Sequence, residues 1–299
     1  MKTRQAVLAI LVVLVAQGLT QAKDKNHYKF TSFDPPGSVV TYPVGINNNG
    51  LIAVQYGDQE GGFHAASLKH GRYTEIAVPD AVYTLPGVPN MQGQIPLTYL
   101  TSTDSYWHPA LYWRDQFTFL PDVPGFWNDS MWAINARGYG CGLVFNDGTV
   151  VEGYVWNGKH YDVYVHPADT AGFTGCYMIN DWGRIIGEYD TSDGVVHGYL
   201  RNWNRDNYTE IAVPGSPNTT PYGINNWGVI VGMYGKVFIG PWNIRFGDHG
   251  FILRKGTYTT LDYPGAVTSF PTGINDLGQI VGVYLDGAGT IHGYLATPK

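Results

Sequence analysis

Residues 28–47 read YKFTSFDPPGSVVTYPVGIN, and residues 256–275 read GTYTTLDYPGAVTSFPTGIN. Each stretch contains an aromatic, Thr-rich or Ser-rich segment, a Pro-Gly turn and an apolar segment that ends in Gly-Ile-Asn. The last unit of the chain, which ends in IHGYLATPK, is not followed by such an aromatic segment. We therefore expect residues 28–34 to complete that unit by pairing with the strand that contains Gly293 and Tyr294.

The Asn at the end of these stretches recurs along the chain at nearly constant spacing, which is typical of a stacked or closed array of repeats. Its six occurrences are Asn47, Asn90, Asn135, Asn180, Asn225 and Asn275, separated by 43, 45, 45, 45 and 50 residues. An apolar strand follows each Asn-plus-Gly turn. A second strand opens at His64, His108, Glu152, His197, His249 or His292. A third begins near Tyr73, Phe117, Tyr161, Tyr208 and Tyr258, and a fourth leads back to the next Asn.

Four short strands in a unit of about 45 residues are typical of one blade of a β-propeller. Six units predict an all-β, six-bladed propeller that occupies residues 23–299 as one domain. The 39 glycines and the low charged fraction of 14% agree with many tight turns between short strands. Pairing of the first strand with the last blade would close the ring and remove exposed sheet edges.

The units resemble the HAF-type extracellular repeats, in which GIN-D-x-G-x-IVG-x-Y, HG-F/Y-L and T-x-D-x-PGA recur. The resemblance covers residues 28–299 and is most faithful in units one, five and six. Unit two departs with VPNMQGQIPLTYL, and unit three has Glu152 in place of the histidine. The resemblance implies an extracellular repeat architecture and says almost nothing about chemistry.

Residues 1–22 have the features of a secretory signal peptide: Lys2 and Arg4 precede the apolar run AVLAILVVLVA, and small residues follow it. We expect cleavage after Ala22 and a secreted protein with no membrane association. Removal of Lys2 and Arg4 leaves 16 basic against 24 acidic residues, a net charge of −8. Such a surface repels phosphate backbones, so we expect no nucleic-acid partner.

Export bears on two further features of the sequence. Sequons at Asn128, Asn207 and Asn218 predict N-glycosylation in a eukaryotic host. Cys141 and Cys176 could form a disulfide in an oxidising compartment or remain as two buried thiols, and the sequence does not distinguish these alternatives.

No motif for a metal, a nucleotide or a nucleophilic triad is present, so we predict neither a metal nor a cofactor. The repeated histidines are expected to serve the packing and hydrogen bonds of each blade, and the repeated asparagines to form turns. Function is more plausibly found where the units differ.

The units differ three to five residues before the Asn, where the innermost strand should face a central channel. The side chains there are Tyr42, Val44, Leu85, Met131, Trp132, Cys176, Tyr177, Tyr222 and Phe270. They either line one aromatic pocket or simply plug the axis. Unit five also carries a seven-residue insertion, YGKVFIGPWNIRFGDHG (234–250). Its apolar residues are expected to fold over the channel mouth as a lid, with Arg245, Lys236 and Asp248 as the nearest charges, although a plain surface hairpin is the alternative.

The chain also resembles the fungal hetero-Diels-Alderases of tropolone sesquiterpenoid pathways, on the basis of the leader, the six units and the aromatic, acid-poor channel. That resemblance implies cycloaddition of an ortho-quinone methide, formed by water loss from a hydroxymethyl tropolone or related polyketide, to an alkene of a humulene-type terpene. Under this hypothesis Arg245, Tyr177 and Tyr222 are catalytic, and Tyr42, Trp132, Trp242 and Phe270 bind substrate. The alternative is a secreted, non-catalytic propeller that binds a glycan or another ligand; a repeat lectin should repeat its site in most blades, whereas an enzyme should concentrate asymmetry in one channel.

Overall fold

The structure, a computed structural model, describes residues 27–146 and 150–299. The expected signal peptide, residues 1–22, lies outside the described residues. Within them the chain is all-β apart from one short 3-10 helix, η2 (Pro241–Asn243). No helix among the described residues is long and apolar enough to cross a membrane.

Four sheets of four antiparallel strands each follow the predicted order of one unit. The first comprises β6 (Ala81–Pro86), β7 (Ile95–Thr101), β8 (Trp107–Trp113) and β9 (Gln116–Phe119). The second comprises β10 (Asn128–Ile134), β11 (Gly140–Asn146), β12 (Val150–Trp156) and β13 (Tyr161–Tyr164). The third comprises β14 (Thr174–Ile179), β15 (Arg184–Asp190), β16 (Val196–Asn202) and β17 (Tyr208–Ile211). The fourth comprises β18 (Thr219–Ile224), β19 (Ile230–Tyr234), β22 (His249–Arg254) and β23 (Thr257–Thr260).

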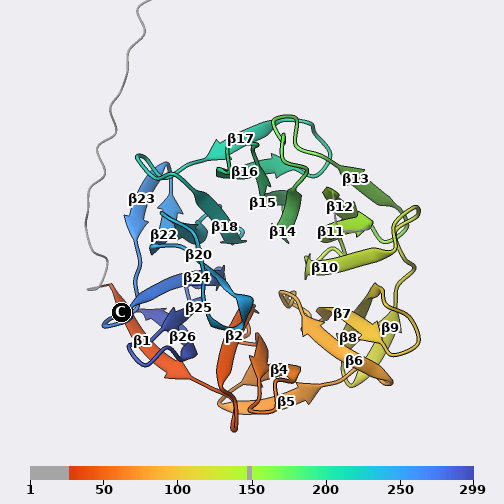
Figure 1. Ribbon diagram of the computed structural model, residues 1–299, viewed down its shortest axis with the longest axis horizontal. Helices are drawn as coiled ribbons and strands as arrows, with labels where there is room; N and C mark the ends of the chain where they lie inside the picture. Colours follow the sequence, from red (N-terminus) through yellow and green to blue (C-terminus); the bar gives the residue numbers. More distant parts are fainter. Residues whose placement is uncertain (1–26, 147–149) are drawn as a thin grey trace, which may run out of the picture.

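The remaining strands form an eight-stranded sheet that holds two further groups of four, joined by a single bridge between Val40 and Ile291. One group comprises β2 (Val40–Ile46), β3 (Ile52–Gly57), β4 (Phe63–Lys69) and β5 (Arg72–Ile76). The other comprises β24 (Thr268–Ile274), β25 (Ile280–Leu285), β26 (Ile291–Pro298) and β1 (Tyr28–Phe33). All six groups stand around a common centre, and in each group the first strand named above lies nearest to it (Figure 1). Strand β1, although first in the chain, lies outermost in its group.

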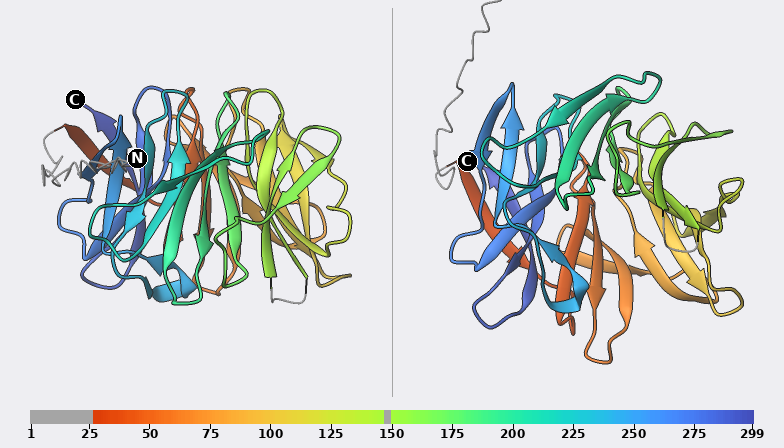
Figure 2. Two further views of the ribbon diagram at one scale, coloured as in Figure 1. Left: turned by 90° about the horizontal axis from the view of Figure 1, so that it is seen from above. Right: turned by 45° about the horizontal axis from the view of Figure 1, so that its top comes forward.

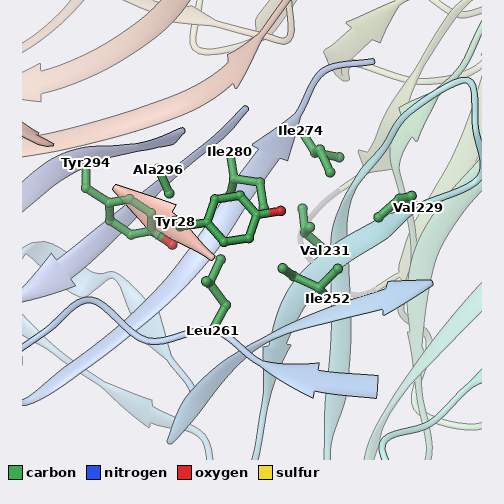
Figure 3. Packing of buried hydrophobic residues seen from close by; sticks show 9 residues of the cluster. All are labelled: Tyr28, Val229, Val231, Ile252, Leu261, Ile274, Ile280, Tyr294 and Ala296. Carbon is green, nitrogen blue, oxygen red and sulfur yellow. The ribbon is translucent and has the colours of Figure 1, made fainter. Parts of the chain in front are cut away.

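The pairing of the first strand with the last is as predicted. Strand β1 runs antiparallel to β26, with Ser32 opposite Tyr294 and Phe33 opposite Gly293. Tyr28 of β1 enters a core cluster between neighbouring sheets, beside Ile280, Tyr294 and Ala296 (Figure 3). The strand therefore contributes both backbone hydrogen bonds and buried apolar surface to the last group.

The repeated asparagines form turns, as predicted, and also connect neighbouring units. Asn47 Oδ1 accepts the backbone N–H groups of Asn49 and Leu51 at 2.9 and 3.0 Å. Its Nδ2 donates to the backbone oxygen of Asn90 at 2.7 Å. The other five repeat this donation to the next unit, and Asn275 returns it to Asn47 at 3.1 Å. The six side chains thus form a closed cycle of hydrogen bonds at one end of the central channel.

A second repeated contact secures each inner strand. Six residues before the Asn stand Thr41, Thr84, Asp129, Thr174, Thr219 and Ser269. In four units this hydroxyl accepts a backbone N–H of the preceding connection; Thr84, for example, accepts that of Val78 at 3.1 Å. Asp129 accepts the N–H of Val123 in the same way at 2.6 Å, but its Oδ1 is buried and has no hydrogen-bond partner among the described residues.

The repeated histidines pair within their own surroundings, as a packing role predicts. His292, for example, stacks on Tyr284 at 5.0 Å and lies 2.8 Å from Asp34. No group of three or more His, Cys, Asp or Glu side chains in the described part of the chain is placed to hold a metal ion.

The cysteines and the sequons take different environments. Cys141 and Cys176 are free, buried thiols in one core cluster, and burial together with Cys176 raises the pKa of Cys141. Asn207 is exposed. Asn128 is only 9% exposed and accepts the backbone N–H of Trp107, and Asn218 donates to the oxygen of Gly235. Because an attached glycan would displace these contacts, the structure disfavours Asn128 and Asn218 and leaves Asn207 as the candidate glycosylation site.

Candidate functional site

A β-bulge in five inner strands, at the same place in each, aims one side chain out of the regular pleat. The register slips around Val44, Trp132, Tyr177, Tyr222 and Thr272, each three residues before the repeated Asn. A bulge inserts one extra residue and redirects its side chain. The residue type at this position therefore decides how much of the channel each unit fills.

Bulky bulge residues occur in three consecutive units. Trp132, Tyr177 and Tyr222 follow one another around the axis with ring centroids 5.1 and 5.6 Å apart. The corresponding residues of the other three units are the smaller Val44, Gly87 and Thr272. The three rings form an aromatic arc on one side of the axis, and the small residues leave space on the other.

This space is a pocket of about 380 Å³ at the end of the channel opposite the asparagine cycle. Of the seven residues expected to be catalytic or to bind substrate, six line it: Tyr42, Trp132, Tyr177, Tyr222, Trp242 and Arg245. Gln55, Thr98 and Ser130 add polar atoms to the same wall. The aromatic side chains therefore surround a cavity at this end and do not plug it.

Phe270 does not lie where it was expected. It is fully buried behind the pocket, stacked on Tyr222 at 5.5 Å and edge-on to Phe246 at 5.6 Å. Thr272, not Phe270, is the bulged residue of β24, and its hydroxyl donates to the backbone oxygen of Pro43 at 2.5 Å. Phe270 thus supports Tyr222 from behind without reaching the pocket.

The insertion of unit five covers part of the pocket, as the lid hypothesis predicts. It contains the short hairpin β20 (Phe238–Ile239) and β21 (Arg245–Phe246), joined through η2, on one face of the molecule (Figure 2). Trp242 has φ of 60°, and its ring meets Phe63 edge-on at 5.3 Å. Of the three charged residues expected at the site, only Arg245 lines the pocket; Lys236 and Asp248 lie at the root of the insertion and do not.

Arg245 is held by a buried carboxylate that the sequence analysis did not identify. Glu188 on β15 has no exposed surface, and Arg245 Nη2 donates to its two oxygens at 2.6 and 2.5 Å. The hydroxyls of Tyr177 and Thr220 donate to the same carboxylate at 2.8 and 2.7 Å. A buried charge needs such a partner and such hydrogen bonds, so Glu188 ties the lid to the neighbouring sheet.

The network determines which groups can bind a ligand. Burial would lower the pKa of Arg245, but Glu188, Tyr222 and Tyr177 together raise it, so the guanidinium stays charged. Burial raises the pKa of Tyr222 to about 12 and that of Tyr42 well above its usual value, so both phenols keep their protons. Tyr177 already donates its proton to Glu188. In this arrangement Arg245, Tyr222 and Tyr42 are the donors nearest a ligand, and the catalytic role expected of Tyr177 stays a prediction.

A signal for Glu188 was present in the sequence. Gln55, Thr98, Leu143, Glu188, Met233 and Val283 occupy the same place in the strand that follows the Asn turn. Glu188 is the only charged residue among them, and it lies in the interior of β15, where the other residues are Ile185, Ile186, Gly187 and Tyr189. A lone acid in that position predicts a buried partner of opposite charge.

Comparison with known proteins bears on the fold alone. No family model matches the chain, and no curated protein matches its sequence. Among solved structures, AofleA from Arthrobotrys oligospora in a mutant form has 12% identity and a TM-score of 0.55, with 91% of this chain and 88% of that chain covered. A mutant Aleuria aurantia lectin in complex with Fucα1-6GlcNAc has 11% identity and a TM-score of 0.52, with 90% and 96% covered. By fold, the chain is similar to these fungal lectin β-propellers.

Proposed function

We propose that the protein is a six-bladed β-propeller, closed by β1 on β26, that binds one small ligand in the lidded axial pocket. The two halves of the eight-stranded sheet count as two blades beside the other four. Because one protein of similar fold is a lectin, binding is our first candidate function. The observation that carries the proposal is the convergence of six residues that break the repeat, from four sheets and the lid, on a single cavity.

The lining determines the chemistry of this ligand. The aromatic arc of Trp132, Tyr177 and Tyr222 offers ring faces for stacking an apolar or ring-shaped body. Arg245, Tyr222 and Tyr42 are donors, and the buried carboxylate of Glu188 is already bonded to Arg245, Tyr177 and Thr220. The ligand is thus a ring-shaped molecule that presents a carbonyl, enolate or carboxylate oxygen.

The binding test uses the tryptophans of the pocket as reporters. We expect a hydroxymethyl tropolone to change tryptophan fluorescence saturably, and Trp132→Ala or Arg245→Lys to weaken its binding at least about tenfold, as the loss of a stacking ring or a charged hydrogen bond implies. Trp182→Ala is the matched control, because Trp182 is 67% exposed on the asparagine turn of its unit. Equal weakening by the Trp132 and Trp182 substitutions would contradict a pocket site, and methyl α-L-fucoside tests a carbohydrate ligand in parallel.

A second candidate function is the hetero-Diels-Alder reaction. It is favoured by the union of an aromatic wall with a charged donor, since cycloaddition requires two apolar partners held together and a polarised oxygen. Loss of water from the hydroxymethyl tropolone gives the ortho-quinone methide, whose four-atom oxadiene adds across the terpene alkene to form one C–O and one C–C bond. The test compares rate and product stereochemistry with and without protein, using a humulene alcohol. No change in either would reject the enzyme for that pair.

We also propose that the protein is exported. Mass spectrometry of the secreted protein should give a chain that begins near Lys23, and an intact Met1 would contradict it. In a fungal host, enzymatic deglycosylation should lower the mass, and Asn207→Gln should abolish that change.

A further inference from the structure

The histidine that opens the second strand after each asparagine turn is held from two sides in most units. Its Nδ1 faces a carboxylate of the outer strand or its connection, as in His292 with Asp34 at 2.8 Å. Its Nε2 faces the turn that joins the preceding strand to the strand of the histidine itself. The Nε2 contacts are His64 with Asp58 at 2.7 Å, His108 with Asp104 at 3.2 Å, His197 with Thr191 at 3.2 Å and His292 with Asp286 at 3.4 Å.

Unit five breaks this pattern, because the insertion replaces the turn. His249 keeps the outer contact, with Nδ1 3.0 Å from Asp262. Within the described ranges its Nε2 forms no hydrogen bond or ion pair. The His249 side chain is 50% exposed, whereas those of the four counterparts are 18 to 32% exposed. The insertion thus leaves one imidazole nitrogen without the partner that its counterparts have.

His249 lines a second pocket, of about 260 Å³, between the fourth four-stranded sheet and the connection that leads into it. Gly235 and Asp248, which lie at the two ends of the insertion, form part of its wall. The connection Val213–Pro217 closes the opposite side. Tyr234, Tyr258 and Thr260 complete the lining. One insertion therefore produces the lid of the axial pocket and, at its root, a separate hollow.

We propose that this second pocket binds a neutral, hydroxyl-rich ring, that is, a sugar residue. Since Asp262 accepts a hydrogen bond from Nδ1–H, the neutral imidazole has its lone pair on Nε2 and accepts an O–H from the ligand. Asp248 is exposed and uses one carboxylate oxygen for the backbone N–H of Lys236, which leaves the other to accept a second hydroxyl. Tyr258 and Pro214 offer apolar faces for the C–H side of a pyranose ring.

The site is distinct from the axial pocket in both position and chemistry. The two pockets share no lining residue. The axial pocket presents donors to an acceptor oxygen, whereas the pocket at His249 presents acceptors to hydroxyl groups. This inference therefore stands whether or not the axial pocket binds a ring-shaped ligand.

The test titrates methyl glycosides of fucose, galactose, mannose and glucose and follows the imidazole resonances by NMR. For at least one glycoside we expect the His249 signals to shift saturably, and His249→Ala to weaken binding about five- to tenfold, the equivalent of one hydrogen bond. His197→Ala is the matched control, because Thr191 already occupies its Nε2. It should leave binding unchanged.

Two results would overturn the proposal. One is the absence of a His249 shift in the unmodified protein with all four glycosides, which is informative even if His249→Ala fails to fold. The other is glycoside binding that is lost in Trp132→Ala but retained in His249→Ala, since it would place the sugar in the axial pocket.

Discussion

The two ends of the central channel are built from the same inner strands and differ in almost every other respect. At one end, six asparagines repeat one hydrogen-bond geometry and pass a bond from unit to unit until Asn275 reaches Asn47. At the other end the units disagree: the bulge residue ranges from Val44 to Trp132, one unit carries a lid, and one strand contains Glu188. The asparagine cycle holds the inner strands together at one end, so the side chains at the other end can differ from unit to unit.

The difference has a thermodynamic basis. The turn and the cycle use bonds between each Asn and backbone groups, which every residue supplies, so both tolerate changes elsewhere in the unit. The bulge frees one side chain per strand from the pleat, so that its identity hardly affects strand pairing. Stability and binding can therefore be assigned to opposite ends of a strand of six or seven residues.

The largest effect should come from removal of the strand that joins the ends of the chain. Deletion of residues 23–34 removes β1, its hydrogen bonds to β26 and the buried ring of Tyr28. We expect a loss of more than about 5 kcal/mol, comparable with the whole stability of an ordinary domain. Thermal unfolding by circular dichroism measures it, and a truncated chain that melts like the parent would show that the ring does not depend on this pairing.

At the lidded end, Arg245→Ala should destabilise the protein by about 3 kcal/mol, because it leaves the buried charge of Glu188 unpaired. The cost is at the low end for a buried pair, since Arg245 is 27% exposed. Chemical denaturation measures the change. Arg245→Ala therefore changes the stability of the protein as well as its affinity for the ligand. Arg245→Lys keeps the positive charge and is the better probe of binding.

Two further variants test whether the loss of stability in Arg245→Ala comes from the unpaired charge. The double variant Glu188→Gln with Arg245→Met removes both charges and should recover much of the loss. Lys236→Ala removes a positive charge from an exposed position in the same insertion and should change stability by less than about 0.5 kcal/mol. A double variant no more stable than Arg245→Ala would mean that packing, not charge, holds the lid.

At the regular end, Asn225→Ala should cost about 2 kcal/mol. It leaves the backbone N–H groups of Trp227 and Val229 without their acceptor and removes the donation to Asn275. Ligand affinity in the axial pocket should be unchanged, because none of these groups lines it. A large change in affinity with little change in the unfolding midpoint would show that the two ends are coupled.

Much of the fold could be predicted from the sequence because the repeat is local and the turn chemistry explicit. The spacing of the asparagines gave the strand order, and the match of residues 28–47 with 256–275 gave the partner of β26. The bond from each Asn to the next unit could not be predicted, since its acceptor is a backbone oxygen and leaves no mark in the residue types.

The candidate site was only partly predictable, for a reason that Phe270 and Glu188 illustrate. Counting back from the Asn identifies the channel-facing region but does not locate the bulge, so Phe270 was expected in the pocket wall although Thr272 is the bulged residue of its strand. Glu188 pairs with Arg245, 57 residues later in the chain. Neither contact follows from the period of the repeat, because both depend on where the chain departs from it.

The smallest effect concerns Asp129. This residue differs from its counterparts in the other units, and it secures an inner strand and does not line the axial pocket. Five units carry Thr or Ser at this place, and Asp129 replaces the hydroxyl with a buried carboxyl. Burial raises the pKa of Asp129 to about 7, against the slight opposing effect of its bond from the Val123 N–H. Asp129→Thr restores the common residue and should stabilise the protein by about 1 to 2 kcal/mol at pH 8.

The pH dependence of this gain follows from the direction of the shift. Below about pH 4 the carboxyl is protonated in the folded and unfolded chains alike, so the two proteins should differ little. Between pH 4 and 7 the unfolded chain loses its proton while the folded chain retains it, so the stability of the parent falls relative to Asp129→Thr as pH rises. Above pH 7 the difference is constant. Denaturation at pH 4, 6 and 8 measures the difference in the free energy of unfolding between the two proteins. All other titrating groups are common to both, so they cancel in this difference. A difference that does not grow with pH would contradict a neutral, buried Asp129.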